Sequence, residues 1–250
     1  ISQLPAPNAG VTLTKRTITA NGCPNHYSVC TGKDGPPGCS AIGAEGTDTE
    51  AAPQDHVIDI PAYPVIATST TSNECELGIS SIALNGVSIF NGAVNQQCEL
   101  VVTTDATSEW TSFDMCAGHA ASGNYHYHFP PSCLLAQAEA TNPTADGHSP
   151  QIGWSFDGFP MYGPKGPGGV MRTAAELDSC GGKEEEIPDL DSFKYRYYFT
   201  GDVSNLYALP GYPMPDGATD YPFAQACVVG CTMTEITAGT CSVDTSRPGT

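Results

Sequence analysis

The strongest folding signals in the chain are two short turns, each set inside a run of β-prone residues. Asn85-Gly86 lies within residues 82–90, and Asp157-Gly158 lies within residues 154–162. Asn-Gly and Asp-Gly favour tight hairpin turns because these residues tolerate the positive φ that a type I′ turn requires. Each segment is therefore predicted to form a β-hairpin, with a type I′ turn.

Each hairpin is followed by a Cys-x-Gly element and then by a tyrosine-rich segment. In the first copy these are residues 116–119, Cys-Ala-Gly-His, and residues 125–129, Tyr-His-Tyr-His-Phe. In the second copy they are residues 180–183, Cys-Gly-Gly-Lys, and residues 195–199, Tyr-Arg-Tyr-Tyr-Phe. The recurrence of three elements in the same order predicts an internal repeat.

Alignment of the two halves, about residues 77–133 and 149–200, keeps the cysteine, glycine and tyrosines but changes three histidines. The aligned pairs are His119 with Lys183, His126 with Arg196, and His128 with Tyr198. The residues that both halves share are expected to serve tyrosine packing and disulfide bonding. Histidines found in only one half are expected to have a function specific to that half. The alternative is a chance likeness between two unrelated units, because the gaps differ in length.

The composition indicates a disulfide-stabilised β protein. Eleven cysteines are more than a reduced cytosolic protein usually carries, so we expect a secreted, extracellular protein; the odd count leaves at least one cysteine free, bonded to another molecule or a ligand. With 27 glycines and 21 prolines, helical periodicity is confined to residues 134–140 and 173–177. We predict a single mainly β, loop-rich, sandwich-like domain over residues 15–242, built from two pseudo-repeated halves with few short helices, and terminal arms at 1–14 and 243–250.

The charge restricts the partners. Nine Lys+Arg against 27 Asp+Glu give a net charge of −18, which repels nucleic acid and attracts cations. No run of eighteen apolar residues occurs, so no membrane insertion is expected. Ile1 is not followed by a basic and then an apolar segment, so we expect any signal peptide to have been removed. The expected partners are a metal ion and either extracellular matrix or a small-molecule ligand.

Three of the six histidines, His119, His126 and His128, lie within ten residues and form a candidate metal site. In a strand, residues i and i+2 point to the same face about 7 Å apart, so His126 and His128 can converge on one ion. The small, turn-forming residues 120–124 can reverse the chain and bring His119 to the same place. Tyr125 and Tyr127 then point to the opposite face.

Three imidazoles leave coordination positions open, as in catalytic zinc sites, and they also suit copper(II). The predicted cofactor is therefore one transition-metal ion, copper or zinc. The alternative is that these histidines are surface groups or hydrogen-bonded core groups. Additional candidates for a ligand, or for a partner of the ligands, are His148, His26 and Asp157, although a turn alone explains Asp157.

The motifs resemble a known family. Residues 125–128, Tyr-His-Tyr-His, resemble the signature of the YHYH protein family, a conserved domain of undetermined function. Residues 21–26, 84–87 and 147–164 resemble its other elements, so that the resemblance covers roughly residues 17–231.

This resemblance implies a shared fold and an importance of the histidines rather than a particular reaction. It also implies that His26 and His148 are candidates. Family members often have a second Tyr-His-Tyr-His near the C-terminus, where residues 195–198 here read Tyr-Arg-Tyr-Tyr, and this departure argues against a second metal site.

Three functions fit these observations. The first is a secreted metal-binding protein with a three-histidine site for copper or zinc. The second is a zinc-type extracellular hydrolase or hydratase with an open metal position, although the chain has neither His-Glu-x-x-His nor Gly-x-Ser-x-Gly. The third is a structural or adhesive wall or matrix protein without catalysis. No catalytic residue is predicted.

Overall fold

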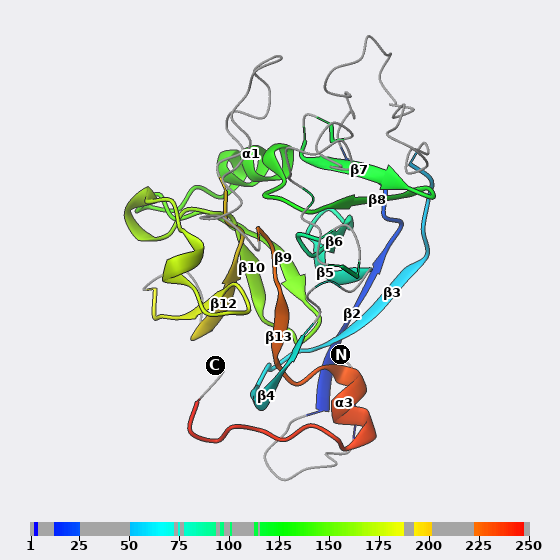
Figure 1. Ribbon diagram of the computed structural model, residues 1–250, viewed down its shortest axis with the longest axis vertical. Coiled ribbons are helices and arrows are strands. Elements are labelled where there is room, and N and C mark those ends of the chain that lie inside the picture. Colours follow the sequence, from blue (N-terminus) through cyan, green and yellow to red (C-terminus); the bar gives the residue numbers. More distant parts are fainter. Residues whose placement is uncertain are drawn as a thin grey trace.

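The protein is mainly β with few short helices, as predicted (Figure 1). The computed structural model describes residues 3–4, 13–25, 51–72, 75, 78–93, 96–97, 101, 113–114, 116–187, 193–201 and 223–247. Within these ranges, no helix is long and apolar enough to cross a membrane.

An eight-stranded sheet forms the centre of the fold. Its strands, in spatial order, are β11 (Gly182–Glu184), β12 (Tyr195–Tyr198), β10 (Pro160–Tyr162), β9 (Gln151–Ser155), β5 (Ile79–Ala83), β6 (Ser88–Phe90), β8 (Asn124–Tyr127) and β7 (Gly118–Ala121). The pairs β6·β8 and β10·β12 are parallel, and the other neighbours are antiparallel.

The strand order is symmetric about the centre of the sheet. From the β5·β9 pair outwards, β5, β6, β8 and β7 on one side take the places of β9, β10, β12 and β11 on the other, with the same directions. At the centre, Ile82 pairs with Trp154, and each lies three residues before the Asn or Asp of its turn. This is the arrangement expected of two related halves; their limits, 77–133 and 149–200, stay a prediction.

Both hairpins form where they are predicted, but the prediction of type I′ turns is wrong. In the first turn, Ala83 N–H donates to Val87 O at 2.9 Å and Gly86 N–H donates to Ala83 O at 2.8 Å, and the second turn has the corresponding bonds. Only the glycines, Gly86 at φ +83° and Gly158 at φ +87°, have positive φ in these turns. Each loop is therefore three residues long and closed by a left-handed glycine, whereas type I′ requires positive φ at both central residues.

A carboxylate organises the turn before each outer strand. Asp114 Oδ1 accepts the N–H groups of Cys116 at 2.8 Å and Gly118 at 3.2 Å, and its Oδ2 accepts the Tyr125 hydroxyl at 2.6 Å. The corresponding bonds in the second half run to Asp178 from Cys180, Gly182 and Tyr195, at 2.9, 3.0 and 2.9 Å. The two halves thus share a hydrogen-bond network as well as a strand order.

The tyrosine face of the sheet is buried in the core. It packs against helix α1 (Ser132–Thr141) and against a two-stranded sheet of β4 (Ile66–Ser72) and β13 (Cys227–Gly230). Val229 N–H donates to the Tyr197 hydroxyl at 2.9 Å, so β13 lies directly on this face. The core residues from β8 and β12 are Tyr125, Tyr127, Tyr195 and Tyr197.

Disulfides join each half to the element that covers it. Cys116 bonds to Cys133 in α1, and Cys180 bonds to Cys227 in β13. A third disulfide, Cys231–Cys241, spans α3 (Met233–Ala238). Cys75 is also disulfide-bonded, and among the described cysteines Cys23 is free. The predicted disulfide framework is therefore present.

The other elements lie at the periphery. A sheet of β1 (Gln3–Leu4), β2 (Leu13–Ala20) and β3 (His56–Pro61) runs along one side of the molecule (Figure 1, blue and cyan), and two 3-10 helices are η2 (Pro167–Gly169) and η3 (Ala174–Glu176). The predicted arms contain paired residues, because Leu4 pairs with Leu13 and Val243 bridges to Ala67. The domain limits 15–242 stay a prediction.

The two aspartates predict unequal losses of stability. Asp114 is 2% exposed, so Asp114→Ala leaves buried donors without a partner and should lower the free energy of unfolding by about 1–3 kcal/mol. Asp178 is exposed, so water can replace its carboxylate and Asp178→Ala should cost less. Denaturant unfolding of both variants measures the difference; a greater loss for Asp178→Ala would contradict the role given to Asp114.

Candidate metal centre

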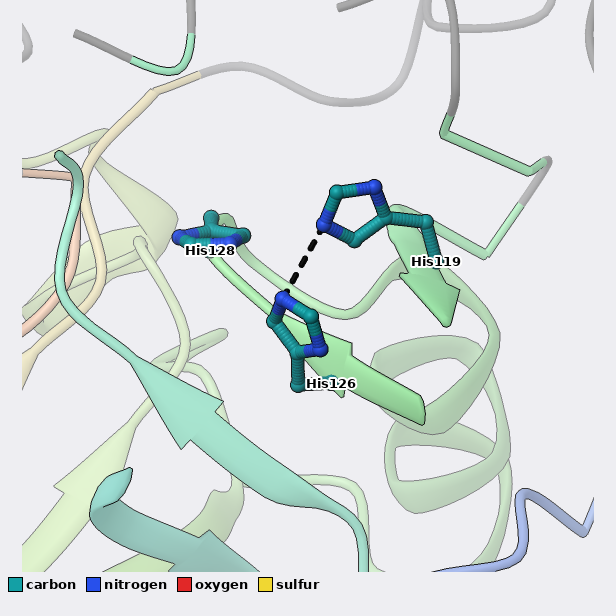
Figure 2. A group of neighbouring side chains, drawn as sticks. All are labelled: His119, His126 and His128. Carbon is teal, nitrogen blue, oxygen red and sulfur yellow. Dashed lines mark hydrogen bonds between the residues drawn. The ribbon is translucent and has the colours of Figure 1, made fainter. Parts of the chain in front are cut away.

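The β7–β8 hairpin brings the three clustered histidines together. His119 and His126 are directly opposed on the two antiparallel strands, and His128 follows β8 on the same face as His126. Figure 2 shows the three rings pointing toward one another, and one ring nitrogen from each lies within 4.8 Å of the others. Their side chains are 2–3% exposed. This geometry confirms the predicted convergence, and the group could hold a metal ion.

Backbone carbonyls fix the orientation of two of the rings. His126 Nδ1 lies 2.9 Å from the carbonyl oxygen of Asn124, and His128 Nδ1 lies 2.5 Å from that of Asn91. Because a carbonyl oxygen only accepts, each Nδ1 carries the proton and each neutral ring leaves its lone pair on Nε2. His126 Nε2 in turn lies 3.0 Å from His119 Nε2 (Figure 2). Metal-binding histidines commonly donate their other ring N–H to a carbonyl oxygen, as His126 and His128 do here.

The turn that supplies the Asn91 carbonyl is itself held in place. The Asn91 side chain accepts the N–H of Ala93 at 2.9 Å through its Oδ1, and the residue is 4% exposed. This bond positions the backbone carbonyl on which the orientation of the His128 ring depends.

Two phenylalanine rings line the cluster. Phe90 stacks on His126 with ring centroids 4.0 Å apart and meets the edge of His128 at 5.7 Å. Phe113 lies 4.6 Å from His119 and 5.8 Å from His128. The histidines therefore sit against an apolar wall with little access to bulk water.

Burial keeps all three histidines neutral. It lowers the pKa of His126 from the usual 6.5 to about 4. It lowers the pKa of His119 well below 6.5, with a further contribution from the neighbouring imidazoles, and it acts in the same way on His128. An imidazole binds a metal through its neutral form, so the cluster is ready to act as a ligand set at neutral pH.

The other candidate ligands lie outside this cluster. His148 Nε2 is hydrogen-bonded to the Tyr198 hydroxyl at 2.8 Å, in the second half of the sheet. Asp157 is fully buried, and it accepts the Tyr197 hydroxyl at 2.7 Å and the Gly230 N–H at 2.9 Å, so its oxygens serve the fold; burial raises its pKa. Neither residue belongs to the group that could hold an ion. His26 lies outside the described residues.

The corresponding place in the second half carries fixed charges. Lys183 pairs with Arg196 across β11 and β12, as His119 pairs with His126. Glu185 accepts the Arg172 guanidinium at 2.6 Å and the Tyr198 hydroxyl at 2.6 Å.

Sequence reasoning missed the surroundings of the cluster. Phe90 lies at the end of a β-prone run, which favours burial but does not identify the ring on which it stacks. Phe113 gave no signal, because nothing in the local sequence places it beside His119. The Asn91 carbonyl gave none either, because every residue has a backbone carbonyl.

Comparison with known proteins gives one finding, a match of residues 57–170 to the model of the family described as YHYH protein. No match to the chain was found among the curated proteins or among the solved structures. The matched range contains the three clustered histidines, His148 and Asp157, and it ends before β11 and β12. Residues 57–170 therefore match the YHYH family, in agreement with the resemblance that the motifs predicted.

Proposed function

We propose that the protein binds one transition-metal ion, copper or zinc, through His119, His126 and His128. The observation that carries this proposal is the convergence of three buried imidazoles, of which two are held by backbone carbonyls with Nε2 turned into the cluster. Nitrogens bound to one zinc or copper ion at about 2.0–2.1 Å lie roughly 3.3–3.5 Å apart. The 3.0 Å between His119 Nε2 and His126 Nε2 is close to that spacing.

Metal binding without catalysis is the form of this proposal that the site favours. A zinc-type hydrolase or hydratase needs a general base beside the metal. In the part of the chain that the structure describes, the group that could hold the ion consists of three histidines, so a general base would have to come from outside this group. The cluster is also nearly closed to solvent, since its side chains are 2–3% exposed.

We also propose that the protein acts in an oxidising compartment outside the cell. The disulfides Cys116–Cys133, Cys180–Cys227 and Cys231–Cys241 support this location, because such bonds persist where thiols are not kept reduced. The net charge of −18 also favours the approach of cations from solution.

Removal of two ligands should abolish metal binding. The purified protein, loaded with zinc or copper and freed of excess ion, should contain one ion per chain, and the double variant His126→Ala, His128→Ala should contain almost none. His148→Ala is the matched control, since it removes a buried histidine outside the cluster and should keep the ion. Elemental analysis measures the content, and equal metal in the double variant and the wild type would reject the site.

Because the histidine ligands are buried, the metal affinity should change little in mild acid. Protons compete with the metal only near the pKa of the ligands, which burial lowers to about 4 for His126 and well below 6.5 for the other two. Between pH 7.5 and 5.5 the affinity should change by less than about twofold, whereas three exposed imidazoles would lose roughly 1,000-fold.

Competition against a chelator, corrected for the chelator's own protonation, measures this profile. A steep loss of affinity below pH 6.5 would show that the ligands are in contact with solvent, contrary to the site described here.

A further inference from the structure

The ligand set carries no charge of its own. The three donors are imidazole nitrogens, and neither a carboxylate nor a thiolate belongs to the group among the described residues. An ion bound there would keep its full positive charge, because neutral ligands donate electron density without cancelling the charge of the ion.

Among the described residues, the groups that line the cluster do not compensate for that charge. The histidines are 2–3% exposed, and the rings of Phe90 and Phe113 lie against them. The cost of moving an ion from water into an apolar medium rises with the square of its charge, so a divalent ion costs about four times as much as a monovalent one. Burial among neutral groups therefore selects for the lower charge.

In the second half of the sheet, a carboxylate stabilises the cations at the corresponding place. Glu185 follows β11, and its carboxylate lies against Arg172 and Tyr198 and 3.8 Å from the Lys183 amine. Glu185 N–H also pairs with the Lys194 carbonyl, as the next step of the β11·β12 ladder.

The counterpart of Glu185 in the first half is Ala121. Ala121 lies two residues after His119 and pairs with Asn124, as Glu185 lies two residues after Lys183 and pairs with Lys194. The metal centre thus lacks a counter-charge at the one place where its structural equivalent has it.

On the basis of the proposed function, we propose that the centre holds copper as three-coordinate Cu(I). Cu(I) is monovalent, has a filled d shell and is satisfied by three nitrogen ligands. Cu(II) favours a tetragonal set of four or more ligands, and zinc completes a tetrahedron with a fourth ligand. The charge, the ligand number and the closed apolar wall all favour Cu(I) over either divalent ion.

Anaerobic competition experiments test this selectivity. Cu(I) is supplied with a Cu(I)-specific chelator, while Zn(II) and Cu(II) are each supplied with a chelator of known affinity. Cu(I) should bind at least about 100-fold more tightly than Zn(II). X-ray absorption of the Cu(I) complex should show three nitrogen ligands.

A designed pair of variants isolates the effect of charge. Ala121→Glu places a carboxylate where the second half has Glu185, and Ala121→Gln adds the same bulk without charge. Ala121 is partly exposed, so both side chains can be accommodated. Ala121→Glu should lower the ratio of Cu(I) to Zn(II) affinity at least about tenfold relative to Ala121→Gln.

The outcomes separate the two proposals. If the wild-type protein binds none of the three ions, the proposed function fails. If Zn(II) or Cu(II) binds as tightly as Cu(I), metal binding stands and the assignment of Cu(I) is overturned. Equal affinity ratios in the Glu and Gln variants would overturn the argument from charge.

Discussion

The antiparallel register of β7 and β8 is the constraint on which the candidate site depends. It sets His119 directly opposite His126, and a slip of one residue would turn the histidines into the core and the tyrosines outward. The register is held from the other face of the sheet, where Asp114 joins the turn before β7 to the Tyr125 hydroxyl in β8. The core thereby fixes the geometry of a site that lies outside it.

The two halves of the sheet show that this framework and the chemistry on it vary independently. The aspartate network and the buried tyrosine face occur in both halves. On the opposite face, one half has neutral imidazoles and the other has fixed cations with a carboxylate, Glu185, between them. In the second half, Glu185 pairs with Arg172 and Lys183, whereas the first half has neutral nitrogen donors that could bind an ion.

Local sequence rules predicted the elements of this arrangement but not its surroundings. Strand alternation placed His126 and His128 on one face, and the turn at residues 120–124 returned the chain to His119. The predicted type I′ turn was wrong because each loop has three residues, of which only the last, a glycine, has positive φ. A type I′ turn has two central residues, both with positive φ. The Asn91 carbonyl and the Phe113 ring contact the site only through tertiary folding, which leaves no pattern in the local sequence. His148 is hydrogen-bonded to Tyr198 in the other half of the sheet.

The central proposal is that His119, His126 and His128 bind one metal ion through their Nε2 atoms. A crystal structure of the metal-loaded protein, with anomalous diffraction recorded on both sides of the copper and zinc absorption edges, tests it most directly. The account predicts a single strong anomalous peak about 2 Å from Nε2 of His119, His126 and His128. An anomalous map without a peak there, or rings bonded only to protein groups, would contradict it.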